Sequence, residues 1–442
     1  MEQKVWLISV NMGYGHQRTA YPLKSLAAEG KIINANSYQG IPETDRKIWE
    51  TTRRLYELIS NFGRVPLIGK TAFSIYDQLQ KILSFYPKRE IIKPNLALKQ
   101  IFSLLKKGWG KHLIEKLKQK PLPLISTFFT PAFMAEFFEY PRDIFCVVCD
   151  ADVSRTWAPL KPAQSKIKYF APTARVVERL KLYGVKPENI FLTGYPLPIE
   201  NVGTEKMDAT HPPPLLKEDL RYRLFNLDPQ KRYFEKYKIL IETNLGKLPK
   251  KANHPLTIMF SVGGAGAQKE IGIKIVKSLA EKIKTNKIKI ILVAGVREKV
   301  KEYFEKNIQQ LNLARIARGP ASGNSGIEIL FEKDIEDYFQ KFNLALRKTD
   351  ILWTKPSELS FYAALGLPII IAPPIGSQEE FNERWLLKSG FGALEENPNH
   401  TNQWLFDWLD QGYLAEAAMQ GFIEGEKLGT FNIQNIISKC SG

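Results

Sequence analysis

The chain has 442 residues, a formal net charge of +17 and 44% hydrophobic residues. This length exceeds what one hydrophobic core usually supports, and the composition is that of a folded protein, so we expect two domains. The positive charge comes without a helix-turn-helix, zinc-finger or RNP-type pattern, which argues against nucleic acid as a partner and favours an anionic lipid surface or a phosphorylated substrate. No apolar run approaches the roughly 18 residues that a bilayer-spanning helix needs.

The N-terminal residues and the cysteines bear on the cellular location of the protein. Residues 1–10 run directly into an apolar strand and lack the layout of a secretory signal, so we expect no export and a cytoplasmic location. Three cysteines, Cys146, Cys149 and Cys440, are an odd number. Their spacing favours buried thiols over a redox pair or a metal site, because further ligands are missing nearby.

Strands and helices alternate in the first part of the chain, which predicts a parallel sheet with helices on both faces. A long insertion at about 43–120, rich in aromatic and basic residues, interrupts this order. We assign residues 1–204 to an N-terminal domain. Its expected strands are 4–11, 32–35, 123–127, 144–149, 167–171 and 190–194, and its expected helices are 16–28, 131–138 and 174–183.

Residues 205–254 break this order with proline-rich and glycine-rich stretches and are expected to form a linker or insertion. A second alternating series follows, which we assign to a C-terminal domain of residues 255–442. Helices after Asn402 are expected to cap this domain and to extend back toward the first. The expected strands of the series are 256–262, 288–295, 350–353 and 368–373, and its expected helices are 269–284, 299–312, 334–346 and 358–365.

Each domain opens with a strand followed by a glycine-containing turn. Such turns place backbone N–H groups near a crevice and suit an anionic ligand, although many of them only permit close packing of a helix on a sheet. Neither turn has the ending of a Walker A motif, and the dinucleotide-binding pattern fits poorly. The first turn contains Gly13, Tyr14, Gly15 and His16, and the second contains Gly263, Gly264 and Gly266.

Residues 354–386 carry the most specific pattern. Thr354-Lys355 precedes a helical segment that ends in Gly366-Leu367-Pro368, and an apolar strand then leads to Gln378-Glu379-Glu380 and Asn382. This segment resembles glycosyltransferase family 28, and within it the monogalactosyldiacylglycerol synthases and the processive diacylglycerol glucosyltransferases. The GYGH turn at 13–16 and the segments at 146–157 and 170–197 are similar to the same family, so the resemblance covers most of the chain outside 205–254.

The resemblance implies a GT-B fold, with two doubly wound Rossmann-like domains facing a central cleft, and a metal-independent enzyme without a cofactor. Asp150 follows an apolar strand, where α/β sheets place working groups, and a carboxylate or an imidazole can deprotonate an acceptor hydroxyl. Asp150 and His16 are therefore candidates for catalysis, with helix capping as the alternative for both. The remaining candidates are Gly263, Gly264, Gly266, Lys355, Ser357, Glu358, Gln378, Glu379 and Asn382 for the donor, and Gly13, Tyr14 and Gly15 for an acceptor-side loop.

One departure from the family bears on nucleotide binding. Where the family usually carries a ribose-binding Glu, this sequence has Phe361, and Glu358 one helical turn earlier is a candidate substitute. The identity of the nucleotide therefore stays open, with UDP the expected one.

The insertion between Arg46 and Lys120 combines an excess of basic residues with interleaved aromatics. This pattern is typical of a surface that rests on anionic lipid, because aromatic rings settle at the headgroups while Lys and Arg meet the phosphates. The alternative is that the aromatics pack the insertion onto its own domain, since several apolar residues also have helical spacing. The aromatics concerned are Trp49, Tyr56, Phe62, Phe73, Tyr76, Phe85 and Tyr86.

Together these features predict a glycosyltransferase. It would use a nucleotide-sugar donor and a lipid acceptor such as diacylglycerol, and would associate peripherally with the cytoplasmic membrane. A nucleotide-sugar epimerase or hydrolase on the same fold, and a binding protein without catalysis, are the alternatives.

Overall fold

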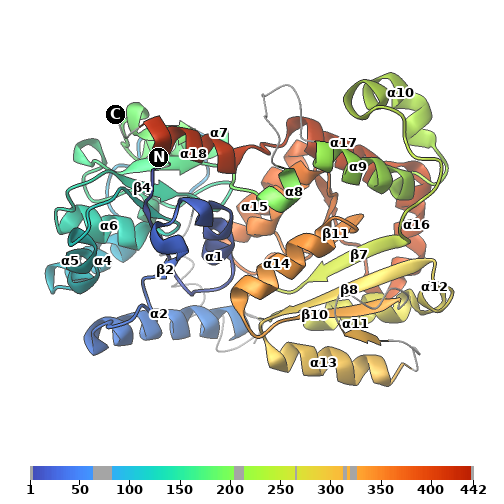
Figure 1. The fold of residues 1–442 in the computed structure, drawn as a ribbon, viewed down its shortest axis with the longest axis horizontal. Coiled ribbons are helices and arrows are strands. Elements are labelled where there is room, and N and C mark those ends of the chain that lie inside the picture. Colours follow the sequence, from blue (N-terminus) through green and yellow to red (C-terminus); the bar gives the residue numbers. More distant parts are fainter. Residues whose placement is uncertain are drawn as a thin grey trace. The chain divides into compact units, whose positions relative to one another are not determined.

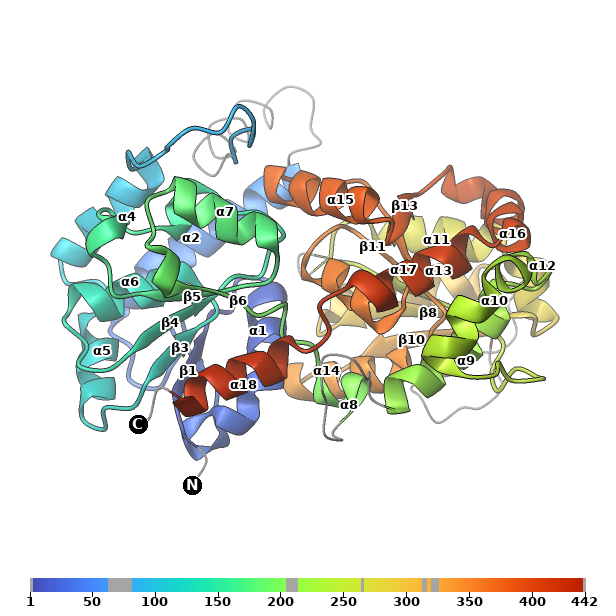
Figure 2. The same ribbon diagram turned by 90° about the horizontal axis from the view of Figure 1, so that it is seen from above.

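The computed structural model describes residues 3–62, 82–203, 214–263, 266–311, 316–318 and 326–439. The chain divides into two compact units, each drawn in Figures 1 and 2. Unit 1 comprises Met1–Leu197, Ile375–Asn382 and Leu428–Gly442, and unit 2 comprises Pro198–Pro374 and Glu383–Lys427. The chain therefore returns twice from unit 2 to unit 1.

Unit 1 contains a six-stranded sheet in the order β2-β1-β3-β4-β5-β6, in which each strand pairs in parallel with its neighbours. The chain moves outward from β1 to β2 and then returns to the other side of β1 with β3. The topological switch point thus lies between β1 and β3, where ligands of such sheets usually bind. The strands are β1 (Trp6–Ser9), β2 (Ile33–Asn34), β3 (Leu124–Ser126), β4 (Ile144–Val147), β5 (Lys168–Ala171) and β6 (Ile190–Leu192).

Helices of unit 1 begin at polar caps where the sequence provides them. The Asn95 side chain accepts from Leu98 N (2.9 Å) at the start of α4, and Thr173 accepts from Val176 N (3.2 Å) at the start of α7. The helices are α1 (Gly15–Ala20), α2 (Glu43–Phe62), α4 (Leu96–Lys106), α5 (Lys111–Lys118), α6 (Phe129–Phe137), α7 (Ala174–Leu182) and α18 (Gly429–Lys439). Short 3₁₀ turns are η1 (Tyr21–Leu26), η2 (Ala28–Gly30), η3 (Arg155–Trp157), η4 (Pro162–Gln164) and η5 (Pro187–Asn189).

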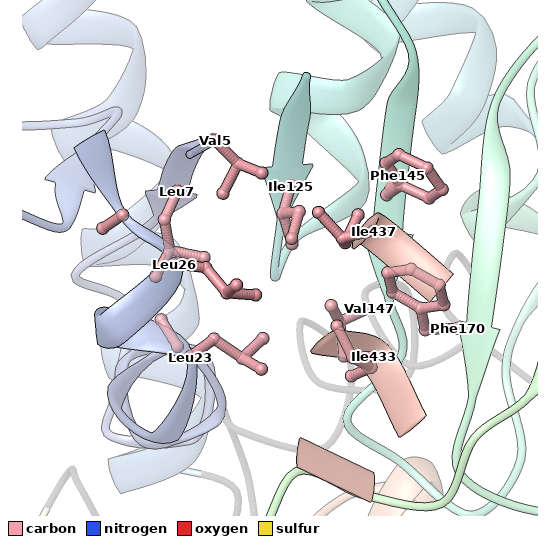
Figure 3. Close-up of a cluster of buried hydrophobic side chains, with 12 residues drawn as sticks. Val5, Leu7, Leu23, Leu26, Ile125, Phe145, Val147, Phe170, Ile433 and Ile437 are labelled. Atoms are coloured by element: carbon pink, nitrogen blue, oxygen red, sulfur yellow. The ribbon is translucent and has the colours of Figure 1, made fainter. Parts of the chain in front are cut away.

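The C-terminal helix α18 completes the core of unit 1. Register places Leu7, Ile125 and Phe145 in one row across the sheet, on the face that packs against Ile433 and Ile437 of α18. Figure 3 shows these side chains pointing into one cluster, and Figure 2 shows α18 along this face of the strands. Since both isoleucines are almost fully buried, the last helix is part of the N-terminal core and not an appendage.

Unit 2 contains a seven-stranded sheet in the order β13-β12-β11-β7-β8-β10-β9, again with parallel pairs throughout. Its chain moves outward from β7 and returns to the other side with β11, so its switch point lies between β7 and β11. The strands are β7 (Leu256–Ser261), β8 (Ile288–Gly295), β9 (Ile316–Arg318), β10 (Ile327–Phe331), β11 (Ile351–Thr354), β12 (Ile369–Ile371) and β13 (Gly392–Leu394).

Helices cover both faces of the second sheet. Figure 1 shows α11 and α13 on one side of the strands and α14 on the other. The helices are α8 (Ile199–Val202), α9 (Pro214–Leu227), α10 (Arg232–Leu245), α11 (Lys269–Ser278), α12 (Ala280–Lys284), α13 (Glu298–Gln309), α14 (Ile335–Leu346), α16 (Thr401–Gln411) and α17 (Tyr413–Glu424), with 3₁₀ turns η6 (Glu358–Leu365) and η7 (Pro398–His400). Helix α15 (Ser377–Ser389) begins in unit 1 and ends in unit 2.

The predicted α/β fold class with two doubly wound Rossmann-like domains is confirmed by the two parallel sheets, each with its own switch point. The stretch expected as a linker or insertion at 205–254 instead supplies two helices of unit 2, α9 and α10. Arg223 of α9 explains the attachment, because its buried guanidinium donates to backbone oxygens of Thr349 (2.8 Å), Leu365 (2.7 Å) and Gly366 (3.1 Å). Burial lowers the pKa of Arg223, and the negative charges of Asp219 and Asp350 partly offset this lowering.

Within the described ranges, none of the helices has both the length and the apolar composition needed to cross a bilayer.

Candidate functional site

Lys355 and Gly263 meet at the switch point of unit 2. Lys355 follows β11 and Gly263 follows the adjacent strand β7, which pair in parallel through Thr354 and Ser261. A β-carbon on Gly263 would lie 2.2 Å from Cε and 3.2 Å from Nζ of Lys355. The lysine stem therefore occupies the space that glycine leaves open, and a cationic group lies at the glycine turn.

The rest of this turn is closed by its own backbone. Gly266 has a φ of +72°, and its N–H donates to Gly263 O (2.7 Å). Gln268, which precedes α11, donates through Nε2 to Pro373 O (2.8 Å) and so ties the turn to the end of β12. The remaining predicted residue of the turn, Gly264, lies outside the described residues.

Phe361, at the position where the resemblance implies a ribose-binding Glu, is part of the core. Phe361 is 4% exposed, and its ring lies 5.1 Å from that of Trp385, centroid to centroid. An aromatic side chain in this place offers no acceptor for ribose hydroxyls. Ser357 and Glu358 are both partly exposed at the start of η6, next to Lys355, so the first turn of η6 is where polar side chains remain accessible.

His16 is fixed at the switch point of unit 1. Its Nδ1 lies 2.8 Å from Thr127 O, directly after β3, and Thr127 Oγ1 donates to His16 O (2.9 Å). A carbonyl oxygen only accepts, so Nδ1 carries the proton, and Nε2 is the basic nitrogen of the neutral ring. The Phe128 ring lies 4.7 Å from the imidazole and supports this orientation.

Asp150 lies at the carboxyl end of β4 and is half-buried. Its Oδ1 accepts from Asn382 Nδ2 at 3.1 Å, and both residues belong to unit 1. Cys149 Sγ lies 3.9 Å from Asp150 Oδ2 and 3.5 Å from His16 Nδ1. One thiol thus contacts both predicted catalytic side chains, and the structure brings Asp150 and His16 into one cluster.

The backbone after Asp150 is held by a buried ion pair. Arg179 of α7 donates to both carboxylate oxygens of Asp152, at 2.8 and 2.7 Å, and Asp152 also accepts from Val153 N (2.9 Å). Burial alone lowers the pKa of Arg179, but the bidentate contact with Asp152 outweighs it and raises that pKa. Removing either partner would leave a buried charge, so this pair fixes the loop that presents Asp150.

Gln378 and Glu379 form the first turn of α15, and both are partly exposed. Glu379 Oε2 accepts from Ile375 N at 2.8 Å, which shapes the turn that leads into the helix. Asn382 lies one turn further on and is fully buried. The structure therefore groups the predicted sugar-contacting residues with Asp150 in unit 1.

The predicted acceptor-side loop follows β1. Gly13 has a φ of +95°, which requires glycine, and Tyr14 is nearly buried before α1 begins at Gly15. Asn11 and Asn36 exchange two hydrogen bonds, of 2.9 and 3.0 Å, which anchor this loop to the end of β2. The loop is thereby fixed beside His16.

Some aromatic side chains of the insertion are buried in the core, and others are exposed at the surface. Trp49 is 3% exposed and packs on Trp109, with ring centroids 4.8 Å apart, so the interfacial interpretation is wrong for this residue. Phe85 is half-buried beneath the guanidinium of Arg175, 3.8 Å from the ring centroid. Tyr86 is 65% exposed. The predictions for Phe73 and Tyr76, and for the side chains of Tyr56 and Phe62, lie outside the described residues.

Sequence reasoning named the titratable residues of the candidate site but not the groups that hold them in place. Thr127 acts through its carbonyl group, and Cys149 through contacts to His16 and to its chain neighbour Asp150, and no local pattern marks either role. Cys146 and Cys149 are buried free thiols, as expected, and burial raises the pKa of Cys146. In the part of the chain that is described, no cluster of three or more His, Cys, Asp and Glu residues is arranged to hold a metal ion.

Comparison with known proteins gives matches along most of the chain. A family model described as a domain of unknown function (DUF6938) matches residues 247–432. The processive diacylglycerol beta-glucosyltransferase of Bacillus subtilis (strain 168) is 23% identical over 402 residues, which cover 88% of this chain and 82% of that protein. Among solved structures, MurG of Acinetobacter baumannii is 14% identical with a TM-score of 0.48 over 99% of both chains. A UDP co-structure of S. aureus MnaA is 12% identical with a TM-score of 0.49, over 99% of this chain and 96% of that one.

The sequence match bears on the expected family. The diacylglycerol glucosyltransferase match spans both units and agrees with the resemblance of residues 354–386 and of the GYGH turn. The chain is therefore similar in sequence, across both units, to processive diacylglycerol beta-glucosyltransferases.

Proposed function

We propose that the chain is a hexosyltransferase that moves a sugar from a nucleotide-sugar donor, UDP-linked, to the hydroxyl of a lipid such as diacylglycerol. The observation that carries the proposal is the cluster at the end of β4, where Asp150 and His16 both contact the sulfur of Cys149. Two groups able to accept a proton thus lie together at the carboxyl edge of one sheet, with His16 at its switch point, where α/β folds bind their ligands. Similarity to a lipid glucosyltransferase over 88% of the chain supports the assignment.

The proposed donor site uses Lys355 and the glycine turn. When the sugar is transferred, negative charge develops on the leaving diphosphate, and an ammonium group with nearby backbone N–H groups stabilises that charge. Lys355 lies against Gly263 and therefore offers its charge where a phosphate could approach the backbone closely. This arrangement requires no metal ion and no cofactor.

The proposed donor sugar contacts come from Gln378 and Glu379. An amide and a carboxylate supply the donors and acceptors that sugar hydroxyls need, and both residues are partly exposed. Because Phe361 is packed in the core, the ribose hydroxyls are assigned to Glu358, one turn earlier in η6. These assignments take the resemblance as their starting point and adapt it to the observed packing.

In the proposed reaction, Asp150 removes the proton of the acceptor hydroxyl as its oxygen attacks the anomeric carbon of the donor. The glycosidic bond forms while the bond from the sugar to the diphosphate breaks, and the nucleoside diphosphate leaves. His16 is the second proton acceptor, through Nε2, because Nδ1 is directed at Thr127 O. The loop with Gly13, Tyr14 and Gly15 borders the acceptor beside it.

The lipid acceptor agrees with the surface of residues 83–107. Four large apolar side chains are exposed there: Leu83 (36%), Tyr86 (65%), Ile92 (46%) and Leu96 (65%). The same stretch holds six basic residues and one acidic residue. Exposed apolar groups among basic ones suit an anionic membrane surface, to which each basic residue contributes about 1 kcal/mol. We therefore place the reaction at the cytoplasmic face of the membrane, with the protein bound peripherally.

A donor panel followed by product analysis tests the proposal. UDP-, GDP- and dTDP-sugars are screened by thermal shift, and the stabilising ones are incubated with membrane lipid extract. A UDP-sugar that stabilises the protein and yields a glycolipid supports the proposal. Turnover of the donor without lipid acceptor would instead indicate an epimerase or hydrolase, and no binding of any nucleotide sugar would indicate a non-catalytic protein.

A further inference from the structure

Asn382 uses both ends of its amide on two consecutive residues. Its Oδ1 accepts from Ala151 N at 2.8 Å, and its Nδ2 donates to Asp150 Oδ1 at 3.1 Å. The side chain is fully buried. A buried amide is favourable only when both of its ends are satisfied, and here Asp150 and its neighbour satisfy them.

These bonds fix the direction of the Asp150 carboxylate. The N–H of Ala151 points to Asn382, and its carbonyl oxygen accepts from Thr173 Oγ1 at 3.0 Å. The backbone that follows Asp150 is therefore held on both sides. With Oδ1 bound to Asn382, the other carboxylate oxygen, Oδ2, has Cys149 Sγ 3.9 Å away. A carboxylate with one oxygen anchored presents the second in a single orientation.

The position of Asn382 in the chain gives this contact a second consequence. Gln378 and Asn382 are four residues apart on α15, so they lie on the same side of the helix, one turn from each other. Both lie in the segment Ile375–Asn382, which belongs to unit 1. Displacement of the first turn of α15 would therefore be transmitted to the anchored oxygen of Asp150.

We infer that Asn382 is a positioning residue for the Asp150 carboxylate, and that it links the sugar-contacting turn of α15 to the proton acceptor. The inference rests on the proposed function, in which Asp150 is the base. It gives Asn382 a role in removal of the acceptor proton and not in binding of the donor sugar. A partner that orients a reacting group typically contributes about 10- to 100-fold to the rate, as outer partners of metal ligands do.

The first measurement compares Asn382→Ala with the wild type in steady-state transfer. The turnover number should fall about 10- to 100-fold, while the KM for the donor changes less than about twofold. The matched control is Asn432→Ala, since Asn432 is a half-buried asparagine of unit 1 whose Nδ2 donates to Thr193 O (2.8 Å). The control should keep its turnover. A raised donor KM with unchanged turnover in Asn382→Ala would overturn the inference and make Asn382 a donor ligand.

The second measurement repeats Asn382→Ala in an Asp150→Asn background. A residue that acts only through Asp150 has nothing left to position there, so turnover should not fall further. If the two losses multiply, Asn382 acts by another route and the inference fails. If Asp150→Asn alone retains near-normal turnover, the assignment of Asp150 as the base also fails. The single variant therefore separates failure of the proposed base from failure of the positioning role of Asn382.

The exchange Asp150→Asn with Asn382→Asp guards against variants that do not fold. The amide and the carboxylate change places, so a hydrogen-bonded pair remains. The melting temperature of the exchange variant should therefore be closer to that of the wild type than the melting temperature of Asn382→Ala is. Turnover should stay low, because the carboxylate now lies on α15. Recovery of both melting temperature and turnover would show that the contact is only a structural tie.

Discussion

Lys355 lies across Gly263, so that a methyl group in place of the glycine hydrogen would fall 2.2 Å from Cε of the lysine. The two residues follow adjacent parallel strands, β11 and β7, at the switch point of their sheet. The contact between them allows the proposed donor site to be tested without knowledge of the sugar.

Loss of the lysine should weaken nucleotide binding. We expect Lys355→Ala to lower the affinity for UDP by about tenfold or more, because a charge-assisted contact to phosphate contributes about 1.5–3 kcal/mol. Calorimetry with UDP measures this. Lys348→Ala, which removes an exposed lysine of the same unit, is the control and should bind as the wild type does.

Gly263→Ala should weaken UDP binding in the same direction by displacing the lysine. In the Lys355→Ala background the methyl group has room, so the second substitution should have little further effect on affinity. Additive losses in the double variant would show that Gly263 is needed for another reason, such as close approach of the phosphate to the backbone.

The first turn of α15 should contribute to the use of the donor sugar. Gln378→Ala is expected to raise the donor KM or lower turnover with little change in melting temperature, since the side chain is partly exposed. Glu379→Ala should do the same and also cost about 1 kcal/mol of stability, because Ile375 N loses its acceptor. Unchanged donor kinetics in both variants would remove these residues from the site.

Binding to membranes should depend on charge and on the surface of residues 83–107. Vesicles with anionic lipid are expected to capture the protein better than neutral ones, and capture should decline with salt as screening shortens to about 8 Å at physiological ionic strength. Tyr86→Asp with Ile92→Asp should reduce capture several-fold. The control is Ile239→Asp, which alters an 83% exposed isoleucine of unit 2. Equal capture by both vesicle types would contradict the lipid assignment.

Glu395 should make the stability of unit 2 depend on pH. Burial raises its pKa to about 7, against the hydrogen bond from Trp353 Nε1 (2.8 Å) and the charge of Lys274, which lower it. Between the ordinary pKa of 4.5 and about 7, the folded protein keeps a proton that the unfolded chain has lost. Stability from this group therefore falls as pH rises through that window. Between these pH values, the melting temperature of Glu395→Gln should fall less than that of the wild type. An identical fall in both proteins would contradict the attribution of this pH dependence to Glu395.

The sequence predicted the elements whose apolar runs are uninterrupted. Strand β8 was expected at 288–295, which is where it lies, with seven of its eight positions buried and only Lys289 partly exposed. Strands β9 and β10 were not expected, since residues 313–333 showed no clear periodicity. Helices α9 and α10 were predicted to be a linker because proline and glycine flank them, and the attachment of α9 depends on tertiary contacts of Arg223 that the sequence does not mark.

Candidate residues could be predicted where local sequence marks them, but contacts between residues distant in the sequence could not. Asp150, His16 and Lys355 became candidates because they follow strands or glycine turns, and the structure places each at a carboxyl end of its sheet. Asn382 was assigned to the donor by resemblance, whereas its hydrogen bonds connect it to a residue more than 200 positions away. A partner so distant in the sequence leaves no spacing to detect.

The most direct test of the account is transfer of labelled sugar from a UDP-sugar to diacylglycerol in anionic vesicles, by the wild type and by Asp150→Asn. The account predicts labelled glycolipid with the wild type. With Asp150→Asn it predicts a rate lower by about 10²- to 10⁴-fold at nearly unchanged donor affinity and melting temperature. Release of UDP without glycolipid in the wild type, or near-normal transfer by correctly folded Asp150→Asn, would contradict it.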